Sequence, residues 1–137
     1  MKRREFMVMT AALGAAPLSA FAAPLDYVDG LVKARLAAGE TVFLDFKASW
    51  CNTCAAQERV LEKLRAENPA YDANITFVNV DWDQYGRSKL TKGLRVPRRS
   101  TLIVLKGDQE LGRIIADTSP TRIKALVDTA LNAATSA

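Results

Sequence analysis

Hydrophobic residues in the first half of the chain fall into three patterned segments. Apolar side chains at helical spacing predict a helix over residues 26–38, and Gly39 follows where a C-terminal cap belongs. Residues 41–48 (TVFLDFKA) carry branched and aromatic side chains on both faces, as strands do when both sides of their sheet are covered. A further helix is predicted over residues 51–68, because a proline follows it.

The second half of the chain alternates in the same way. It predicts a buried strand, a short helix, two strands joined by a tight turn and a final helix, at residues 75–81, 87–94, 101–106, 110–115 and from 119 onward. Ser119 supplies the hydroxyl cap of the last helix and Pro120 its first position. The order predicts an α/β fold with a central mixed β-sheet flanked by helices on both faces.

Residues 1–22 have the three parts of an export signal, namely a basic start, an apolar stretch and small residues before the cleavage position. We expect cleavage after Ala22, which leaves residues 23–137 as one domain in the periplasm. Arg3 and Arg4 precede a phenylalanine in a pattern that resembles the twin-arginine export motif, and a plain basic start for the general export route is the alternative. An uncleaved membrane anchor is a third interpretation, although the segment is barely long enough.

The composition of the chain excludes several classes of catalytic and binding site. The chain has no histidine, which excludes histidine general bases, Ser-His and Cys-His pairs and histidine metal sites. Of the net charge of +4, the first 22 residues hold three basic residues and one acidic residue, so 16 basic and 14 acidic residues remain. That balance is too mild to indicate nucleic-acid binding. The two cysteines stand in one tetrapeptide and cannot form a disulfide framework.

Cys51 and Cys54 are the candidate catalytic residues, because cysteines three apart at a strand-to-helix junction lie on one helical turn. Cys51 would face the unpaired N–H groups and the positive end of the helix dipole, which lower a thiol pKa. Cys54 would lie one turn inside with a higher pKa. This asymmetry suits exchange, in which Cys51 attacks a substrate disulfide and Cys54 resolves the mixed disulfide.

The pair has three other interpretations, namely a zinc site, a copper(I) site and an inert disulfide. Zinc would need two further ligands, and there is no third cysteine and no histidine. Copper(I) on two thiolates would lack soft supporting ligands, because all three methionines lie within residues 1–22. An inert disulfide would close too short a loop to stabilise the fold. No metal and no cofactor is therefore expected.

Trp50-Cys51-x-x-Cys54 after an apolar strand resembles the thioredoxin family, and the match extends from Val42 to Leu131 in the order of elements. The resemblance implies a thioredoxin-like fold with Cys51 as nucleophile and Cys54 as resolving thiol. It also implies that Trp50 packs beside the site. Asp45, six residues before the first cysteine, would accept the proton of Cys54 through water.

Asp45 is unusual without any resemblance, because it is a carboxylate within an apolar strand, where burial is costly. Burial would raise its pKa and make it a proton relay near neutral pH, whereas at a strand edge it would be merely solvated. Lys47 on the same face is a candidate charge partner. The lysine that thioredoxins often place near this aspartate is replaced by Asn79.

The family also places a cis-proline before the third strand, facing the disulfide. We match Pro97 to it, which leaves extra residues before the strand, and the alternative puts Ser100 there with no cis-proline. With Pro97 at the site, Arg98 and Arg99 would line its rim, where they would lower the pKa of Cys51, attract acidic partners or simply be solvated.

The dipeptide Asn52-Thr53 has no histidine to stabilise a thiolate, which favours a reducing protein. The site also resembles that of the periplasmic C-terminal domain of the transmembrane thiol–disulfide interchange protein. This resemblance implies a membrane-embedded electron donor and disulfide-containing exported proteins as clients. The alternatives are a disulfide-forming oxidant and a non-catalytic module that binds copper(I) or clients.

Overall fold

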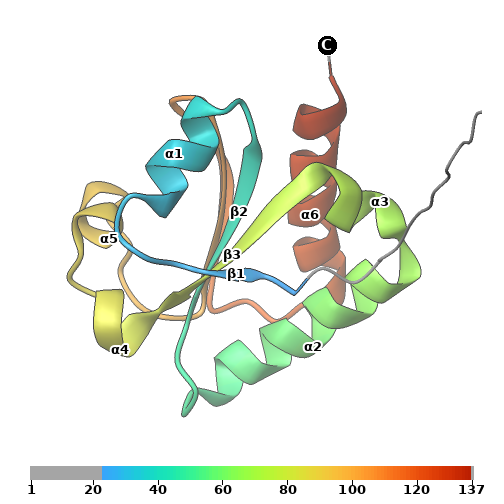
Figure 1. The fold of residues 1–137 in the computed structure, drawn as a ribbon. Helices are drawn as coiled ribbons and strands as arrows, with labels where there is room; N and C mark the ends of the chain where they lie inside the picture. The colour runs from blue at the N-terminus through green and yellow to red at the C-terminus, as the bar shows by residue number, and fades with distance from the viewer. Residues whose placement is uncertain (1–22, 137) are drawn as a thin grey trace, which may run out of the picture.

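The computed structural model describes residues 23–136, which form a five-stranded sheet between two layers of helices (Figure 1). The strands are β1 Leu25–Asp26, β2 Thr41–Lys47, β3 Ile75–Asp81, β4 Thr101–Lys106 and β5 Gln109–Ile115. The helices are α1 Leu31–Ala37, α2 Asn52–Glu67, α3 Pro69–Asn74, α4 Trp82–Tyr85, α5 Lys89–Gly93 and α6 Pro120–Thr135.

The sheet is mixed, as the sequence predicts. Its strand order is β1-β3-β2-β4-β5. β3 runs parallel to both β1 and β2, while β4 runs antiparallel to both β2 and β5. The predicted α/β class with helices on both faces is therefore confirmed, and β2, which leads into the cysteines, is the central strand.

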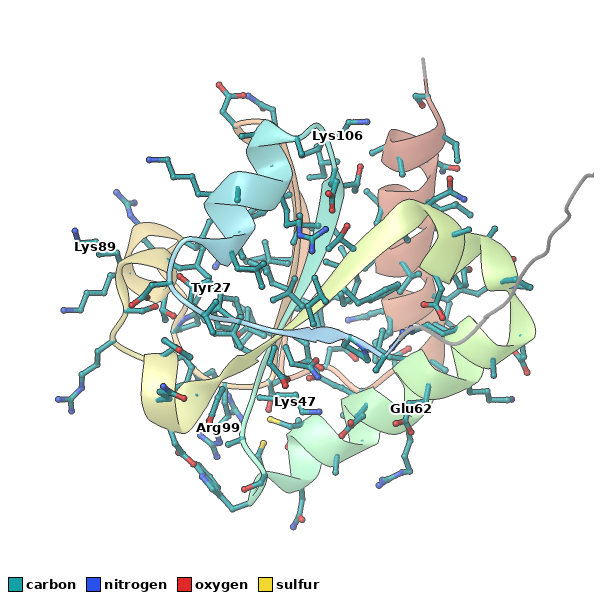
Figure 2. The ribbon with its side chains drawn as sticks, in the orientation of Figure 1. Tyr27, Lys47, Glu62, Lys89, Arg99 and Lys106 are labelled. Atoms are coloured by element: carbon teal, nitrogen blue, oxygen red, sulfur yellow. The ribbon has the colours of Figure 1, made fainter. Side chains whose placement is uncertain are left out.

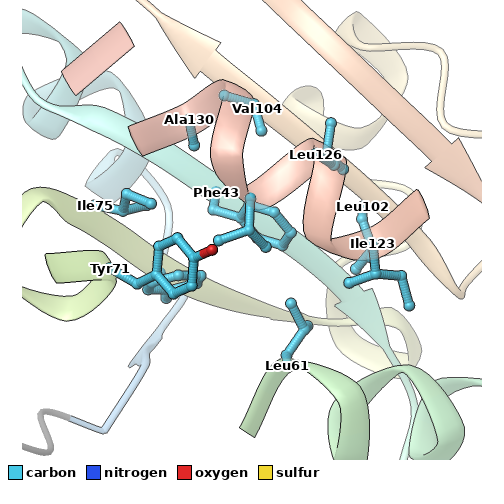
Figure 3. Close-up of a cluster of buried hydrophobic side chains, with 11 residues drawn as sticks. Phe43, Leu61, Tyr71, Ile75, Leu102, Val104, Ile123, Leu126 and Ala130 are labelled. Atoms are coloured by element: carbon cyan, nitrogen blue, oxygen red, sulfur yellow. The ribbon is translucent and has the colours of Figure 1, made fainter. Parts of the chain in front are cut away.

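The two larger apolar cores within residues 23–136 hold the layers together, and β2 contributes to both because its successive side chains point to opposite faces. Phe43 packs under α2, α3 and α6 in the larger core (Figure 3), where its ring lies 5.2 Å from that of Phe77. Leu44 and Phe46 are fully buried in the core on the other face, under α1, α4 and α5. A strand buried on both faces fixes the position of the residues that follow it.

The prediction of a helix over residues 26–38 is wrong at its N-terminal end. Residues 25–26 instead form β1 beside β3, and the Tyr27 N–H donates to the Asn79 carbonyl oxygen at 2.8 Å. The Tyr27 ring packs edge-on against Tyr85, with 4.8 Å between ring centroids. Gly30, with φ at +89°, turns the chain so that α1 begins only at Leu31.

Two short helices were not predicted. Asn68 ends α2 and at the same time caps α3, because its side-chain oxygen accepts a hydrogen bond from the Ala70 N–H at 3.1 Å. α4 follows β3 directly, and Asp81 caps it by accepting from the Asp83 N–H at 3.0 Å. The helix predicted over residues 87–94 is present as the shorter α5.

The predicted export signal, with its cleavage after Ala22, lies outside the described residues. Within residues 23–136, none of the helices combines the length and the apolar character needed to cross a bilayer.

Candidate functional site

Both cysteines lie where β2 passes into α2. Cys51 is the N-terminal cap of α2, with extended backbone, and its sulfur accepts a hydrogen bond from the Cys54 N–H at 3.1 Å. Cys54 lies in the first turn. Both side chains are buried, with exposed fractions of 4% for Cys51 and 1% for Cys54. This is the arrangement that the sequence predicts for the pair.

A serine hydroxyl lies between the two sulfurs. Ser100 Oγ is 3.1 Å from Cys51 Sγ and 3.0 Å from Cys54 Sγ, and the residue is fully buried. β4 positions it, because Thr101 pairs with Phe46 in the sheet and the Ser100 N–H donates to the Phe46 carbonyl oxygen at 2.7 Å.

The match of Pro97 to a cis-proline at the site is corrected by this geometry. Pro97 is exposed, and none of the peptide bonds across the described part of the chain is cis. The loop before β4 turns sharply, with Arg95 and Ser100 both at positive φ, and this takes up the extra residues. The alternative alignment, with Ser100 facing the cysteines, agrees with the structure.

Trp50 lies beside the cysteines, as the resemblance implies, with an exposed fraction of 57%. Its indole N–H donates to both carboxylate oxygens of Asp83 at 3.0 Å each. The guanidinium of Arg99 covers the ring at 4.5 Å from the centroid. The sequence analysis does not identify Asp83 as a site residue, because no local sequence pattern links α4 to residues 49–51. Figure 2 shows Arg99 near the two sulfur atoms at the start of α2.

Hydrogen bonds and burial give the two thiols different pKa values. Burial raises the pKa of Cys51, but hydrogen bonds from the Cys54 side chain, the Ser100 hydroxyl and the Cys54 N–H oppose it. With a further contribution from Arg99, they lower the pKa of Cys51 to about 7. Burial first, and then the Cys51 side chain, raise the pKa of Cys54. The asymmetry expected from the helix position is present.

Asp45 is buried in the central strand, with an exposed fraction of 5%, so the interpretation as a solvated edge residue does not hold. Burial raises its pKa to about 7, Lys47 opposes this shift, and Glu58 and Cys51 add to it. Its Oδ1 has no hydrogen-bond partner among the described residues. The Lys47 ammonium is instead bound to Glu58 at 2.8 Å.

Asp45, Lys47, Glu58 and Asn79 together line a cavity of about 80 Å³ between β2, β3 and α2. Lys47 and Glu58 also line an open cleft of about 680 Å³ that reaches both cysteines. Figure 2 shows Lys47 at the same end of the sheet as the sulfur atoms. A proton leaving Asp45 therefore has the Lys47–Glu58 pair between itself and the cleft.

Gln57 is a fully buried polar residue that the sequence prediction missed. Its Nε2 donates to the Ser100 carbonyl oxygen at 3.0 Å and to that of Asp117 at 3.1 Å. The signal was its position, three residues after Cys54 and four before Leu61 on the inner face of α2. Gln57 therefore fixes the loop that carries Ser100.

Candidate metal ligands are few around the pair. Across residues 23–136 there is no group of three or more His, Cys, Asp and Glu residues that could hold a metal ion. A serine hydroxyl lies within 3.1 Å of both sulfurs, and the chemistry that the arrangement supports is that of two thiols with unequal acidity.

Comparisons with known proteins agree with this site. The family model described as Thioredoxin matches residues 29–129. Thioredoxin H2-1 of Oryza sativa subsp. japonica is 30% identical over 74 residues, and the match covers 54% of this chain but only 49% of the rice protein. The thioredoxin of Coprinus comatus is 28% identical over 93 residues, covering 68% of this chain and 83% of the fungal protein.

Solved structures show the same similarity. The structure of Trxlp from Edwardsiella tarda EIB202 has a TM-score of 0.64 at 33% identity, covering 74% of this chain and 97% of that one. The thioredoxin of Malassezia sympodialis superposes with a TM-score of 0.65 at 21% identity, covering 84% and 96%, and supports the fold alone.

Proposed function

Because the chain belongs to the thioredoxin family and carries that family's Cys-x-x-Cys pair, we propose that it is an exported thiol–disulfide oxidoreductase that reduces disulfides in periplasmic client proteins. The observation that carries the proposal is the unequal acidity of two adjacent thiols, with the pKa of Cys51 lowered to about 7 and that of Cys54 raised. Only the first thiol is then a nucleophile at neutral pH.

The reaction proceeds in two exchanges. The Cys51 thiolate attacks one sulfur of the client disulfide and forms a mixed disulfide, while the other client sulfur leaves as a thiolate and takes a proton from solvent. Cys54 then loses its proton, and its thiolate attacks Cys51 Sγ. The Cys51–Cys54 disulfide forms, the second client thiolate leaves, and the client has gained the two electrons that the dithiol has lost.

Asp45 is proposed as the acceptor of the Cys54 proton. Its pKa of about 7 matches a group that takes up and releases a proton at neutral pH. The cavity of about 80 Å³ beside it is large enough for water. Lys47 and Glu58 line both this cavity and the cleft that reaches Cys54, so the proton would pass by way of that ion pair.

Reduction is favoured over oxidation by two features. A pKa of about 7 for Cys51 agrees with the value of about 7 typical of thioredoxin rather than with the value of about 3.5 of the strong periplasmic oxidant. The intervening Asn52-Thr53 also lacks a histidine. A membrane-embedded carrier is the proposed electron donor, on the resemblance to the periplasmic domain of the interchange protein.

The equilibrium reduction potential of the Cys51–Cys54 pair tests the direction. We expect a value near about −270 mV against a dithiothreitol buffer, as in thioredoxin. A value near about −120 mV would make the protein a disulfide donor instead.

A trapping experiment tests client reduction. Cys54→Ser should accumulate mixed disulfides between Cys51 and exported proteins, because the resolving thiol is gone, and Cys51→Ser is the matched control that should trap none. Client binding without covalent adducts would indicate a non-catalytic binding module.

A further inference from the structure

The hydroxyl between the two sulfurs has chemistry that the cysteines alone do not supply. A serine hydroxyl carries one proton and two acceptor lone pairs, so it donates to one sulfur while it accepts from the other. Ser100 Oγ is within 3.1 Å of both sulfurs. With Cys51 as thiolate and Cys54 as thiol, Oγ–H donates to the Cys51 sulfur, and the Cys54 S–H is shared between Oγ and the Cys51 sulfur.

The backbone holds this hydroxyl in place. The Ser100 carbonyl oxygen accepts from the Ala116 N–H at 2.8 Å and from Gln57 Nε2 at 3.0 Å, while the Ser100 N–H is bound to Phe46. Its φ of 65° is a conformation that residues other than glycine rarely adopt. A strained serine held by three hydrogen bonds against two reactive sulfurs indicates a functional position.

We propose that Ser100 is a catalytic residue of the exchange, whose hydroxyl donates to whichever of the two cysteine sulfurs carries the negative charge. The inference rests on the proposed function, since it concerns the same two sulfurs. Before attack, the proton of Ser100 Oγ is shared with the Cys51 thiolate. In the mixed disulfide Cys51 Sγ is no longer charged, and the hydroxyl turns to Cys54.

The second orientation assists resolution. As Cys54 gives its proton to the carboxylate of Asp45, the Ser100 hydroxyl ceases to accept from that sulfur and donates to it. The Cys54 thiolate then attacks Cys51 Sγ, and the bond between Cys51 and the client sulfur breaks. Ser100 gains and loses no proton over the cycle. A proline at this position, as in the family pattern, has neither an N–H nor a hydroxyl to donate.

The experiment compares Ser100→Ala and Ser100→Gly with the unmodified protein. Glycine tolerates the positive φ, so Ser100→Gly keeps the test valid if the alanine variant does not fold. The pKa of Cys51 is read from thiolate absorbance, and its nucleophilicity from the rate of alkylation at pH 6. Without the hydroxyl we expect the pKa of Cys51 to rise by about one unit and alkylation at pH 6 to slow about tenfold.

Resolution is measured separately, without any client. Cys51 is loaded as a mixed disulfide with thionitrobenzoate, and the release of the coloured thiolate by Cys54 is followed in one turnover. Both Ser100 variants should release it about tenfold more slowly at neutral pH. Ser88→Ala is the matched control, because that hydroxyl also makes a hydrogen bond, to the Thr91 N–H at 3.2 Å, with neither partner a cysteine.

The outcomes separate the two proposals. If the unmodified protein has an ordinary Cys51 pKa and releases no thionitrobenzoate, the proposed oxidoreductase function fails. If the unmodified protein has a lowered Cys51 pKa and releases thionitrobenzoate, the function stands. If Ser100→Gly then matches it in both pKa and release rate, the role of Ser100 is overturned.

Discussion

The guanidinium of Arg99 lies 4.5 Å from the centre of the Trp50 ring, and Arg99 also helps to lower the pKa of Cys51. The buried Nε of Arg99 has no hydrogen-bond partner within residues 23–136. One positive charge thus lies against the aromatic face of Trp50 and near the nucleophilic sulfur, where it stabilises the thiolate more than the thiol.

Replacing that charge should make Cys51 a weaker acid. In Arg99→Met the methionine retains much of the contact with Trp50 but carries no positive charge, so we expect the pKa of Cys51 to rise from about 7 by about half a unit to one unit. Thiolate absorbance against pH measures it. Arg98→Met is the control, because the Arg98 guanidinium donates to the Arg99 carbonyl oxygen at 2.9 Å. Equal shifts in both variants would contradict a specific role for Arg99.

Asp45 should make stability depend on pH. Its pKa rises from 3.8 to about 7 on folding, so the folded protein holds the proton more tightly than the unfolded chain. Stability should therefore fall as pH rises from 3.8 to about 7, by on the order of 4 kcal/mol in all. Asp45→Asn stays neutral and should be more stable than the unmodified protein above pH 7.

Urea unfolding at pH 4 and at pH 8 measures this effect. The two proteins should differ much more at pH 8 than at pH 4, and Asp108→Asn, at an exposed carboxylate, should change neither value. An Asp45→Asn variant destabilised equally at both pH values would show that Asp45 is ionised at its site throughout.

The parts of the site predicted from sequence are those set by local spacing. Cys51 and Cys54 could be placed on one turn because three residues separate them, and Asp45 was identified because a carboxylate in an apolar strand is anomalous. The parts that were missed depend on contacts distant in sequence. Trp50 meets Asp83 across 33 residues, and no local pattern indicates that pairing.

The same limit explains the errors in the fold. β1 has only two residues, and its register with β3 is fixed by long-range pairing rather than by its own apolar pattern. The loop before β4 was misaligned because Arg95 and Ser100 adopt positive φ without being glycine, so its compact path could not be read from residue types.

The two members of the Lys47–Glu58 ion pair should shift the pKa of Asp45 in opposite directions. Lys47 lowers the pKa of Asp45 and Glu58 raises it, so Lys47→Met should raise that pKa above about 7 and Glu58→Gln should lower it. The midpoint of the pH dependence of thionitrobenzoate release reports both shifts. Lys63→Met is the control, since Lys63 pairs with Glu67 farther along α2 at 3.7 Å. Shifts of the same sign in the Lys47 and Glu58 variants would refute the assignment.

Gln57 should stabilise the loop that holds Ser100. Gln57→Met keeps the volume but removes the donor to the Ser100 and Asp117 carbonyl oxygens, and we expect a loss of about 1–3 kcal/mol in the free energy of unfolding. Urea denaturation measures it, with the exposed Gln109→Met as control. An unchanged midpoint would mean that water replaces both hydrogen bonds.

Export should remove residues 1–22. When the full chain is produced in a bacterium with a periplasm, we expect the periplasmic fraction to contain a protein that begins at Ala23, because small residues precede that position. Mass spectrometry of the N-terminus measures it. Changing Arg3 and Arg4 together to lysine preserves the charge and separates the routes, since loss of export indicates the twin-arginine route and unchanged export the general one. An intact N-terminus in the membrane fraction would support the uncleaved anchor. An intact N-terminus in the cytosol would refute export. It would also contradict the proposed reduction of client disulfides, because the cysteines of cytosolic proteins are already reduced.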